Sequence, residues 1–310
     1  MKSKIKAWFF LLLLSVIWGS SFLLIKIALM DSRGVERLTP EILAALRLSL
    51  AFIFLSPLLF YYLKQISIKD LPYLLIAGFL GNGIPAFLFA FAELHLSSAV
   101  TGMLNSLVPV FTLIIAVLFF SFKWKIKHFM GIATGIFGTL LIVGQTNNDG
   151  FLSLPFAPVL MVLLGSLCYA VSLNVIKYKL KHLHPNLITS VSFLFVGIPC
   201  IIYLLSTDFL ASLVAGEVAR DGIFAVLILA LFGTAFAVLI FNRLIKISSP
   251  IFTSSITYLI PLVAVIFGFL YGESISLTQL FGLLVLLMGV LIINVDKPFR
   301  LIKEVFIFGK

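Results

Sequence analysis

The chain consists of long apolar runs separated by short polar segments. Each run is long enough, or nearly so, to cross the roughly 30 Å core of a bilayer, which takes about 20 apolar residues in a helix. A β-barrel would instead give short segments of alternating polarity. The pattern therefore predicts an all-α polytopic membrane protein with ten transmembrane helices. These predicted helices cover residues 7–29, 42–62, 71–92, 99–122, 129–145, 155–176, 186–205, 222–242, 250–271 and 277–295.

Composition excludes a soluble protein of the same length. Hydrophobic residues make up 62% of the 310 residues and charged residues only 11%, whereas soluble domains carry about 25% charged residues. So few charges do not cover the surface of a soluble fold. Within the ten apolar runs, Lys26 and Arg47 are the only charged residues. We therefore expect lipid to be the solvent of most of the chain.

The placement of Lys and Arg predicts the orientation in the membrane. With the N-terminus inside, the inner segments hold 17 of the 22 Lys and Arg residues, and the outer segments hold three. Because cytoplasmic loops carry such an excess, the sequence predicts a multi-pass protein of the cell (inner) membrane with both termini in the cytoplasm. We therefore interpret the net charge of +10 as a consequence of the basic residues that set the orientation. Binding of anionic lipid is the alternative reading, and nucleic acid is not expected as a partner.

The chain repeats itself at an interval of about half its length. The segment Ser15–Lys26 aligns with Ser166–Lys177 at an offset of 151, with serines, an aromatic residue and an Ile-Lys pair in common. Similarity at a fixed interval indicates a duplicated architecture. The sequence thus divides into two halves of five predicted spans, 1–150 and 151–310. Further matches in the same order are Pro109 with Pro261, Gly131 with Gly282, and Gly138 with Gly289.

An odd number of spans in each half has a consequence for topology. The second half must enter the membrane from the opposite face, so the two halves are predicted to be inverted repeats. Inverted repeats related by an axis in the membrane plane are the architecture of many secondary transporters. The alternative is a duplication that only produced a stable ten-helix bundle.

Several short motifs recur in this layout and extend over essentially the whole chain. They are Trp18-Gly19-Ser20-Ser21-Phe22, Pro109, Pro261, Gly272-Glu273, Gly282 and Gly289. With these motifs the sequence resembles the EamA-type branch of the drug/metabolite transporter superfamily. The first half departs from the pattern, since Ser121-Phe122 stands where the second half has Gly272-Glu273. Any role of the Gly-Glu corner is therefore carried by one repeat.

The resemblance implies export of small metabolites, amino-acid-like or related compounds, by alternating access through a central cavity. A membrane-embedded enzyme is an alternative, but it would need a base and a nucleophile near one membrane face. A channel would need charged rings or a carbonyl filter. We expect no catalytic activity and no cofactor, because the polar groups of the spans are scattered amides and hydroxyls without a base. We expect no metal site, because Cys168 and Cys200 fall inside spans as small apolar residues. The expected partners are a small-molecule substrate and the lipid bilayer, and the sequence leaves a homodimer open.

Polar residues in the middle of the spans are the candidates for a substrate path, because polar side chains in a membrane bundle face protein or water. For the repeat-related Trp18 and Tyr169, a stacking wall for a ligand and plain helix packing are equal readings. Asn105 and Thr257 each precede a proline by four residues, which frees a backbone carbonyl; a binding site and a repaired kink are again equal readings. The substrate-binding candidates are Trp18, Ser21, Asn82, Asn105, Tyr169, Asn174, Thr257 and Tyr258.

Arg47 and Glu93 are the candidates for charge recognition or ion coupling. In one reading Arg47 binds an anionic substrate or pairs with a carboxylate, and in the other its long side chain reaches the interface. Glu93 ends the third apolar run and is the best carboxylate candidate for coupling. Because no acidic residue or histidine lies clearly inside a span, the sequence favours facilitated transport or weakly proton-linked exchange.

Overall fold

The computed structural model describes residues 2–31, 33–62, 65–123, 125–144, 156–216, 218–247 and 256–294. These residues are helical throughout apart from short connections. Within them the only β-type pairing is an isolated bridge between Met30 and Glu36. The prediction of an all-α fold is therefore confirmed for the described part of the chain.

The helices of the first half follow one another along the chain with short connections. They are α1 (Lys2–Leu29), α2 (Pro40–Tyr62), α3 (Leu71–Gly78), α4 (Ile84–Glu93), α5 (Ser98–Asn105), α6 (Val108–Phe119) and α7 (Ile126–Val143). The described helices of the second half are α8 (Phe156–Lys179), α9 (Pro185–Ser206), α10 (Phe209–Ala215), α11 (Arg220–Ala230), α12 (Ala237–Ile247), α14 (Ile256–Leu270) and α15 (Leu277–Asn294).

Eight helical segments of the described chain are long and apolar enough to cross a membrane. They correspond to the first eight predicted spans, with α3 and α4 joined in one segment, as are α5 and α6, and α11 and α12. The ninth and tenth predicted spans contain shorter apolar helices, Ile256–Leu270 and Leu277–Ile293. Residues 250–255 of the ninth span lie outside the described residues, so a count of ten spans stays a prediction.

Two predicted spans contain a wide helical turn that the apolar pattern did not indicate. A π-helical segment, Phe79–Gly83, joins α3 to α4, and a second one, Leu231–Phe236, joins α11 to α12. The two segments lie 152 residues apart, and Gly81 and Gly233 occupy equivalent positions in them. Such π-turns are frequent at functional sites.

Local sequence explains where several helices begin and break. Ser97 caps α5, because its side chain accepts a hydrogen bond from the backbone N–H of Val100. The predicted fourth span is not one helix: it breaks at Ser106 and Leu107, and Pro109 lies in the first turn of α6, where a missing N–H costs nothing. Pro261 differs, since it lies inside the continuous helix α14.

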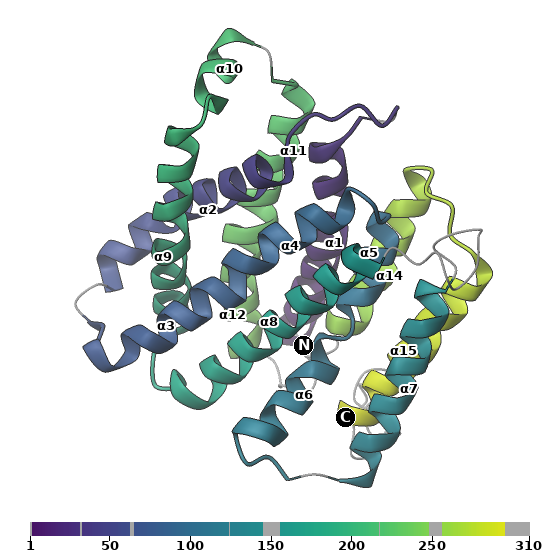
Figure 1. Ribbon diagram of the computed structural model, residues 1–310. Coiled ribbons are helices and arrows are strands. Elements are labelled where there is room, and N and C mark those ends of the chain that lie inside the picture. Colours follow the sequence, from purple (N-terminus) through teal and green to yellow (C-terminus); the bar gives the residue numbers. More distant parts are fainter. Residues whose placement is uncertain are drawn as a thin grey trace.

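One helix was not predicted at all. α10 follows α9 at one end of the bundle and ends at Gly216, which has the left-handed φ of +77° that closes many helices. Its seven residues are too few to span a membrane, which is why a search for long apolar runs does not find it. Figure 1 places α10 opposite the connection between α6 and α7. That second end, called the basic end below, carries five lysines around the start of α7 and in the last turn of α8: Lys123, Lys125, Lys127, Lys177 and Lys179.

The two halves interleave, so that most of the extensive helix contacts join one half to the other. α7 packs along α15, α2 along α9, α1 against α14 and α11, and α8 against α4 and α6. Figure 1 shows α7 and α15 as a pair at one side of the bundle and α2 and α9 at the other. The division at residue 150 is thus a division of sequence, and neither half forms a separate packed body.

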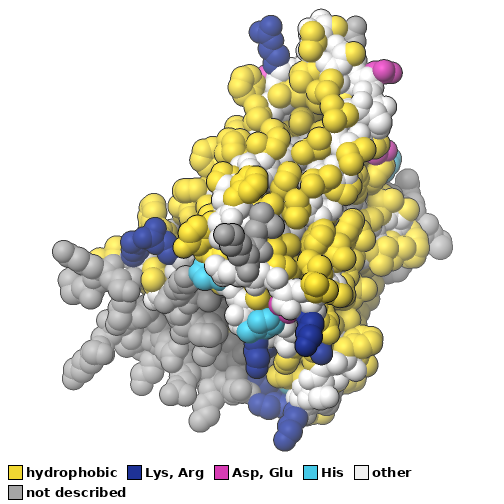
Figure 2. Space-filling view, turned by 90° about the vertical axis from the view of Figure 1, so that its left-hand side faces the viewer, with side chains coloured by type: hydrophobic (Ala, Val, Ile, Leu, Met, Phe, Trp, Pro, Cys, Tyr) yellow, Lys and Arg dark blue, Asp and Glu magenta, His cyan; other side chains and the backbone are white. Residues whose placement is uncertain are grey.

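The outer surface is apolar in its middle, as a lipid-facing surface requires. Figure 2 shows hydrophobic side chains over most of the described face beside α9, with Lys and Arg at its two ends. Exposed apolar residues of this kind include Ile198, Ile202 and Leu205 of α9. This distribution agrees with a bundle surrounded by lipid.

Glycines let α7 and α15 approach to backbone contact. A Cβ added at Gly138 would lie 2.5 Å from the backbone nitrogen of Leu286 and 2.7 Å from the carbonyl oxygen of Gly282. A Cβ added at Gly131 would lie 2.7 Å from the carbonyl oxygen of Gly289. Small residues serve this purpose in membrane bundles, where close packing drives helix association.

We expect Gly138→Ala to lower the free energy of unfolding by about 1–3 kcal/mol, the usual cost of overpacking a tight contact. The matched control on the same helix is Gly135→Ala, because the nearest atom to its new Cβ would be 3.5 Å away. Thermal unfolding of the two purified variants in detergent compares them directly. Equal melting temperatures for both variants and the wild type would contradict the close packing of α7 on α15.

Candidate functional site

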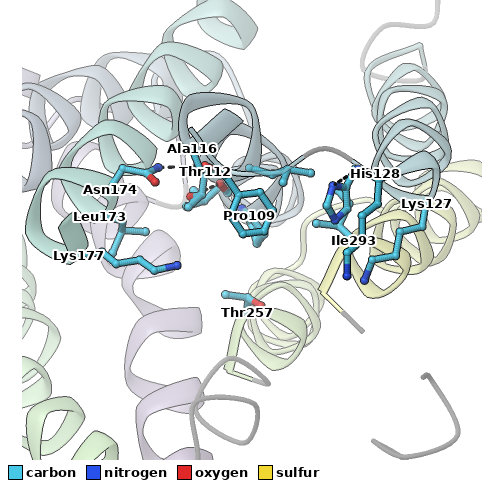
Figure 3. A pocket seen from close by; sticks show the side chains of 14 residues that line it. Pro109, Thr112, Ala116, Lys127, His128, Leu173, Asn174, Lys177, Thr257 and Ile293 are labelled. Atoms are coloured by element: carbon cyan, nitrogen blue, oxygen red, sulfur yellow. Dashed lines mark hydrogen bonds between the residues drawn. The ribbon is translucent and has the colours of Figure 1, made fainter. Parts of the chain in front are cut away.

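A pocket of about 360 Å³ opens beside the basic end, between helices of both halves. Its lining includes Pro109 and Thr112 of α6, Asn174 of α8 and Thr257 of α14. Figure 3 shows Asn174 and Lys177 on one side and Lys127 and His128 on the other. Two of the predicted binding residues, Asn174 and Thr257, are thereby brought to one cavity.

Asn174 is fixed at the boundary between α8 and α6. Its Nδ2 donates to the carbonyl oxygens of Ala170 and Thr112, both at 2.9 Å. The side chain is only 1% exposed, and its Oδ1 has no hydrogen-bond partner among the described residues. A buried amide oxygen without a partner is costly, so a donor group that reached this acceptor would relieve that cost.

The predicted residues Ser21 and Asn82 lie in or against the two π-helical segments. Asn82 is half-buried and stands between Gly81 and Gly83 in the first segment. Ser21 packs against the second segment, where a Cβ added at Gly233 would lie 3.0 Å from its Oγ. In the other half, a Cβ added at Gly81 would lie 2.5 Å from the Oγ of Ser172.

Trp18 and Tyr169 each contact an aromatic residue of the opposite half. The Trp18 ring lies 5.3 Å from that of Phe241, and the Tyr169 ring stacks on that of Phe89 at 5.8 Å. The indole Nε1 of Trp18 also donates to the carbonyl oxygen of Gly233 at 3.2 Å. These contacts hold both aromatic residues between the halves, where packing and a ligand-facing role are compatible.

Arg47 points inward and does not reach for the membrane interface. Its Nε donates to the hydroxyl of Thr234 at 3.3 Å, across to the second π-helical segment. Charge interactions also link it with Tyr169 and Glu93. The interfacial reading of Arg47 is therefore not supported by its contacts, and a role inside the bundle remains.

Glu93 is wholly buried at the end of α4, and neither carboxylate oxygen has a hydrogen-bond partner among the described residues. Its surroundings contain Lys26, Arg47 and Glu273. Lys26 does not bind the carboxylate directly: its Nζ donates to the backbone carbonyl oxygens of Glu93 at 2.7 Å and Leu96 at 3.3 Å. These contacts satisfy carbonyls at the C-terminal end of α4.

Glu273 joins the second half to the first at the end opposite the lysines. Its Oε1 accepts from the backbone N–H of Ser98 at 2.7 Å, and its Oε2 accepts from that of Ala99 at 2.9 Å. Both N–H groups belong to the first turn of α5, where unpaired donors and the helix dipole favour an anion. The Gly-Glu corner therefore has a structural partner in the other repeat.

Two other predicted residues lie away from the pocket. Asn105 closes α5, and its Oδ1 is buried without a partner in the described part of the chain. Tyr258 packs against the main apolar core. Whether these two residues contact a substrate stays a prediction.

Sequence reasoning missed the basic lining of the pocket. Lys125, Lys127 and Lys177 were interpreted as part of the orientation signal, with binding of anionic lipid as the alternative. His128 is 3% exposed, and its Nδ1 accepts from the backbone N–H of Lys125 at 3.2 Å, which caps α7. One signal was present, because Asn174 and Lys177 are three residues apart and so share a helix face.

Residues 5–144 and 156–295 each match the EamA-like transporter family. The chain belongs to this family. Relatives of this EamA-like chain include an uncharacterized inner membrane transporter, YedA, of Escherichia coli. It is 29% identical over 294 residues, which cover 92% of this chain and 89% of YedA. An uncharacterized transporter of Archaeoglobus fulgidus is 25% identical and covers 93% of this chain and 98% of its own.

A solved crystal structure has the same fold as this EamA-like chain. The TM-score is 0.58 at 14% sequence identity, over 92% of this chain and 95% of the other. At that identity the likeness concerns the fold alone. Family and relatives together identify a multi-pass membrane transporter.

Substitution of Glu273 tests the contact between the halves. We expect Glu273→Gln to lower the free energy of unfolding by about 1.5–3 kcal/mol, the range for hydrogen bonds to a charged group. The amide keeps one acceptor and turns an N–H donor toward the second backbone donor. Thermal unfolding in detergent measures the loss. The control is Glu36→Gln, at an exposed carboxylate; a loss no larger than the control's would contradict the role of this contact.

Proposed function

We propose that the protein is a secondary transporter that exports small metabolites, amino-acid-like or related compounds, by alternating access. Its two five-span halves, 1–150 and 151–310, are inverted repeats about an axis in the membrane plane. The two halves enclose a shared path and rock against each other to expose it to either side in turn.

One observation carries this proposal: a contact from the first half to the second has an equivalent contact from the second half to the first. Ser172 packs on Gly81, and Ser21 packs on Gly233. Ser21 and Ser172 are 151 residues apart, and the two glycines are 152 apart. Such reciprocal contacts are the property of two bodies related by a twofold axis. With an odd number of spans in each half, that axis lies in the membrane plane.

The aromatic contacts between the halves are reciprocal in the same way. Trp18 meets Phe241, and Tyr169 meets Phe89. The two phenylalanines are separated by 152 residues and the other two residues by 151. At the level of whole helices, the equivalent helices α7 and α15 pack on each other, as do α2 and α9. These contacts support the twofold relation independently of the serine–glycine pairs.

We assign the substrate path to the polar residues that lie between the halves. Trp18 and Tyr169 form its aromatic walls, with Ser21 and Asn82 beside them at the π-helical segments. Asn105 and Tyr258 complete the inner lining, and Asn174 and Thr257 stand in the pocket near the basic end. Arg47 and Glu93 supply charge at the opposite end of the path, where Glu93 is the candidate for a weak coupling to protons.

In the proposed orientation both termini and the basic end face the cytoplasm of the cell (inner) membrane. The pocket then opens to the cytoplasm, as loading of an exporter requires. At the opposite end, Glu273 and the first turn of α5 hold the halves together. The structure is accordingly assigned to the inward-open state of the transport cycle.

An exchange of residues tests the proposed function. Cells without the gene should retain a metabolite that cells with the gene release, and Gly81→Ser should lower this release at least twofold, because two hydroxyls then compete for one space. The double variant Gly81→Ser with Ser172→Gly restores the original atoms and should restore release. Profiles of extracellular metabolites measure the effect. An unchanged profile on deletion of the gene would contradict export, and a double variant as inactive as the single one would contradict the packing argument.

Labelling of single cysteines tests the inverted topology. In a chain with Cys168→Ala and Cys200→Ala, we expect Asn148→Cys to react with a membrane-impermeant maleimide added to intact cells. Lys310→Cys should react only after the cells are permeabilised. Both positions lie outside the described residues and are chosen from the sequence. Equal reactivity of the two positions in intact cells would contradict the inverted arrangement.

A further inference from the structure

The pocket at the basic end has a one-sided charge. Lys125, Lys127 and Lys177 line it together with His128, and none of its described lining residues is acidic. A concave surface that carries one sign of charge concentrates ions of the opposite sign. The volume of about 360 Å³ falls within the range of small-molecule sites. The pocket is therefore suited to a small anion.

Lys177 differs from its repeat equivalent in what its ammonium group contacts. Lys26 donates to two backbone carbonyl oxygens. The Nζ of Lys177 makes no hydrogen bond to any residue that the structure describes, and it lies 5.2 Å from the ring centroid of Tyr178. In Figure 3 its side chain extends into the pocket. Its N–H donors are thus directed at the cavity and not at the protein backbone.

A second residue of the same pocket, Asn174, requires a hydrogen-bond donor on the ligand in addition to the anionic group. Asn174 is 1% exposed, and its Oδ1 has no partner among the described residues. An amide oxygen accepts hydrogen bonds and does not bind an anion. A molecule that satisfies both Lys177 and Asn174 carries an anionic group together with a hydroxyl or amino donor.

We propose that this pocket binds a small organic anion, a carboxylate or a phosphate, that also bears a hydroxyl or amino group. Lys177 of α8 and Lys127 of α7 bind the anionic group from opposite sides, and Asn174 Oδ1 accepts from the donor group. This inference names the substrate class of the transporter proposed above and rests on that function. The headgroup of phosphatidylglycerol has the same chemistry as a free phosphate ester, so the two sources are separated by experiment.

The first arm measures binding of a free solute. Glycerol 3-phosphate is titrated into the purified full-length protein in nanodiscs of phosphatidylcholine, and glycerol is the matched probe without the anion. We expect glycerol 3-phosphate to bind and glycerol not to bind. Lys177→Gln and Lys127→Gln should each weaken binding about tenfold, the effect of losing one charge-assisted contact. Lys179→Gln is the control, because Lys179 lies on the same helix but faces Tyr73 outside the pocket.

The second arm measures retention of lipid. Phosphatidylglycerol that stays bound to the detergent-purified protein is quantified by mass spectrometry for the wild type and the same three variants. The pocket is assigned to the lipid headgroup if Lys177→Gln and Lys127→Gln, but not Lys179→Gln, retain less phosphatidylglycerol and glycerol 3-phosphate does not bind in the first arm. The pocket is assigned to a free solute if the two variants bind glycerol 3-phosphate more weakly than the wild type but retain as much phosphatidylglycerol.

The proposal is overturned if neither ligand depends on Lys177 and Lys127, or if glycerol binds as well as glycerol 3-phosphate. Asn174→Ala gives a further readout, because it should weaken glycerol 3-phosphate more than inorganic phosphate, which lacks the glycerol hydroxyls. Both arms measure binding without transport. A protein that binds the anion but exports nothing would contradict the proposed function and leave the site intact.

Discussion

Close contact between the two halves at small residues is the constraint on which this structure depends. Lipid tails are as apolar as the helices, so removal of apolar surface from lipid provides no driving force, and van der Waals packing must supply it. Close approaches at Gly81, Gly138 and Gly197 each join one half to the other. Each half therefore completes the packing of its partner, and the rocking movement proposed above would have to preserve or re-form these contacts.

The same duplication leaves the two ends of the bundle unequal. Gly272 after α14 has a φ of +92°, and its equivalent Ser121 after α6 has a φ of +53°, so both halves turn through the left-handed region at this point. The next residue differs. Glu273 binds backbone N–H groups of α5, whereas Phe122 lines the pocket. In the sequence, Pro250 stands 152 residues after Ser98 and has no N–H to offer. A carboxylate contact of the same kind is thus available at one end only, and the hollow lies at the other.

The sequence was sufficient to predict properties that depend only on the order of residues along the chain, such as the length of an apolar run or the interval of a repeat. Apolar length located the first eight spans, and a constant offset paired Trp18 with Tyr169 and Ser21 with Ser172. The π-helical segments and the break at Ser106 escaped prediction, because they depend on packing between spans and not on hydropathy. The placement of Asn174 and Thr257 in one pocket is likewise a long-range property. It required the positions of α6, α8 and α14, which no local pattern contains.

The basic residues illustrate how one sequence feature serves two physical demands. The orientation rule requires an excess of Lys and Arg in the segments of one side and is indifferent to where their side chains point. Lys179 satisfies it beside Tyr73, and Lys177 satisfies it while extending into the pocket. In the inverted arrangement proposed above, the second copy keeps the lysine but not its surroundings. Lys26 stands at the opposite end of the bundle, where backbone carbonyls of α4 take its hydrogen bonds. The duplicated lysine therefore has a structural role in one half and a position at the pocket in the other.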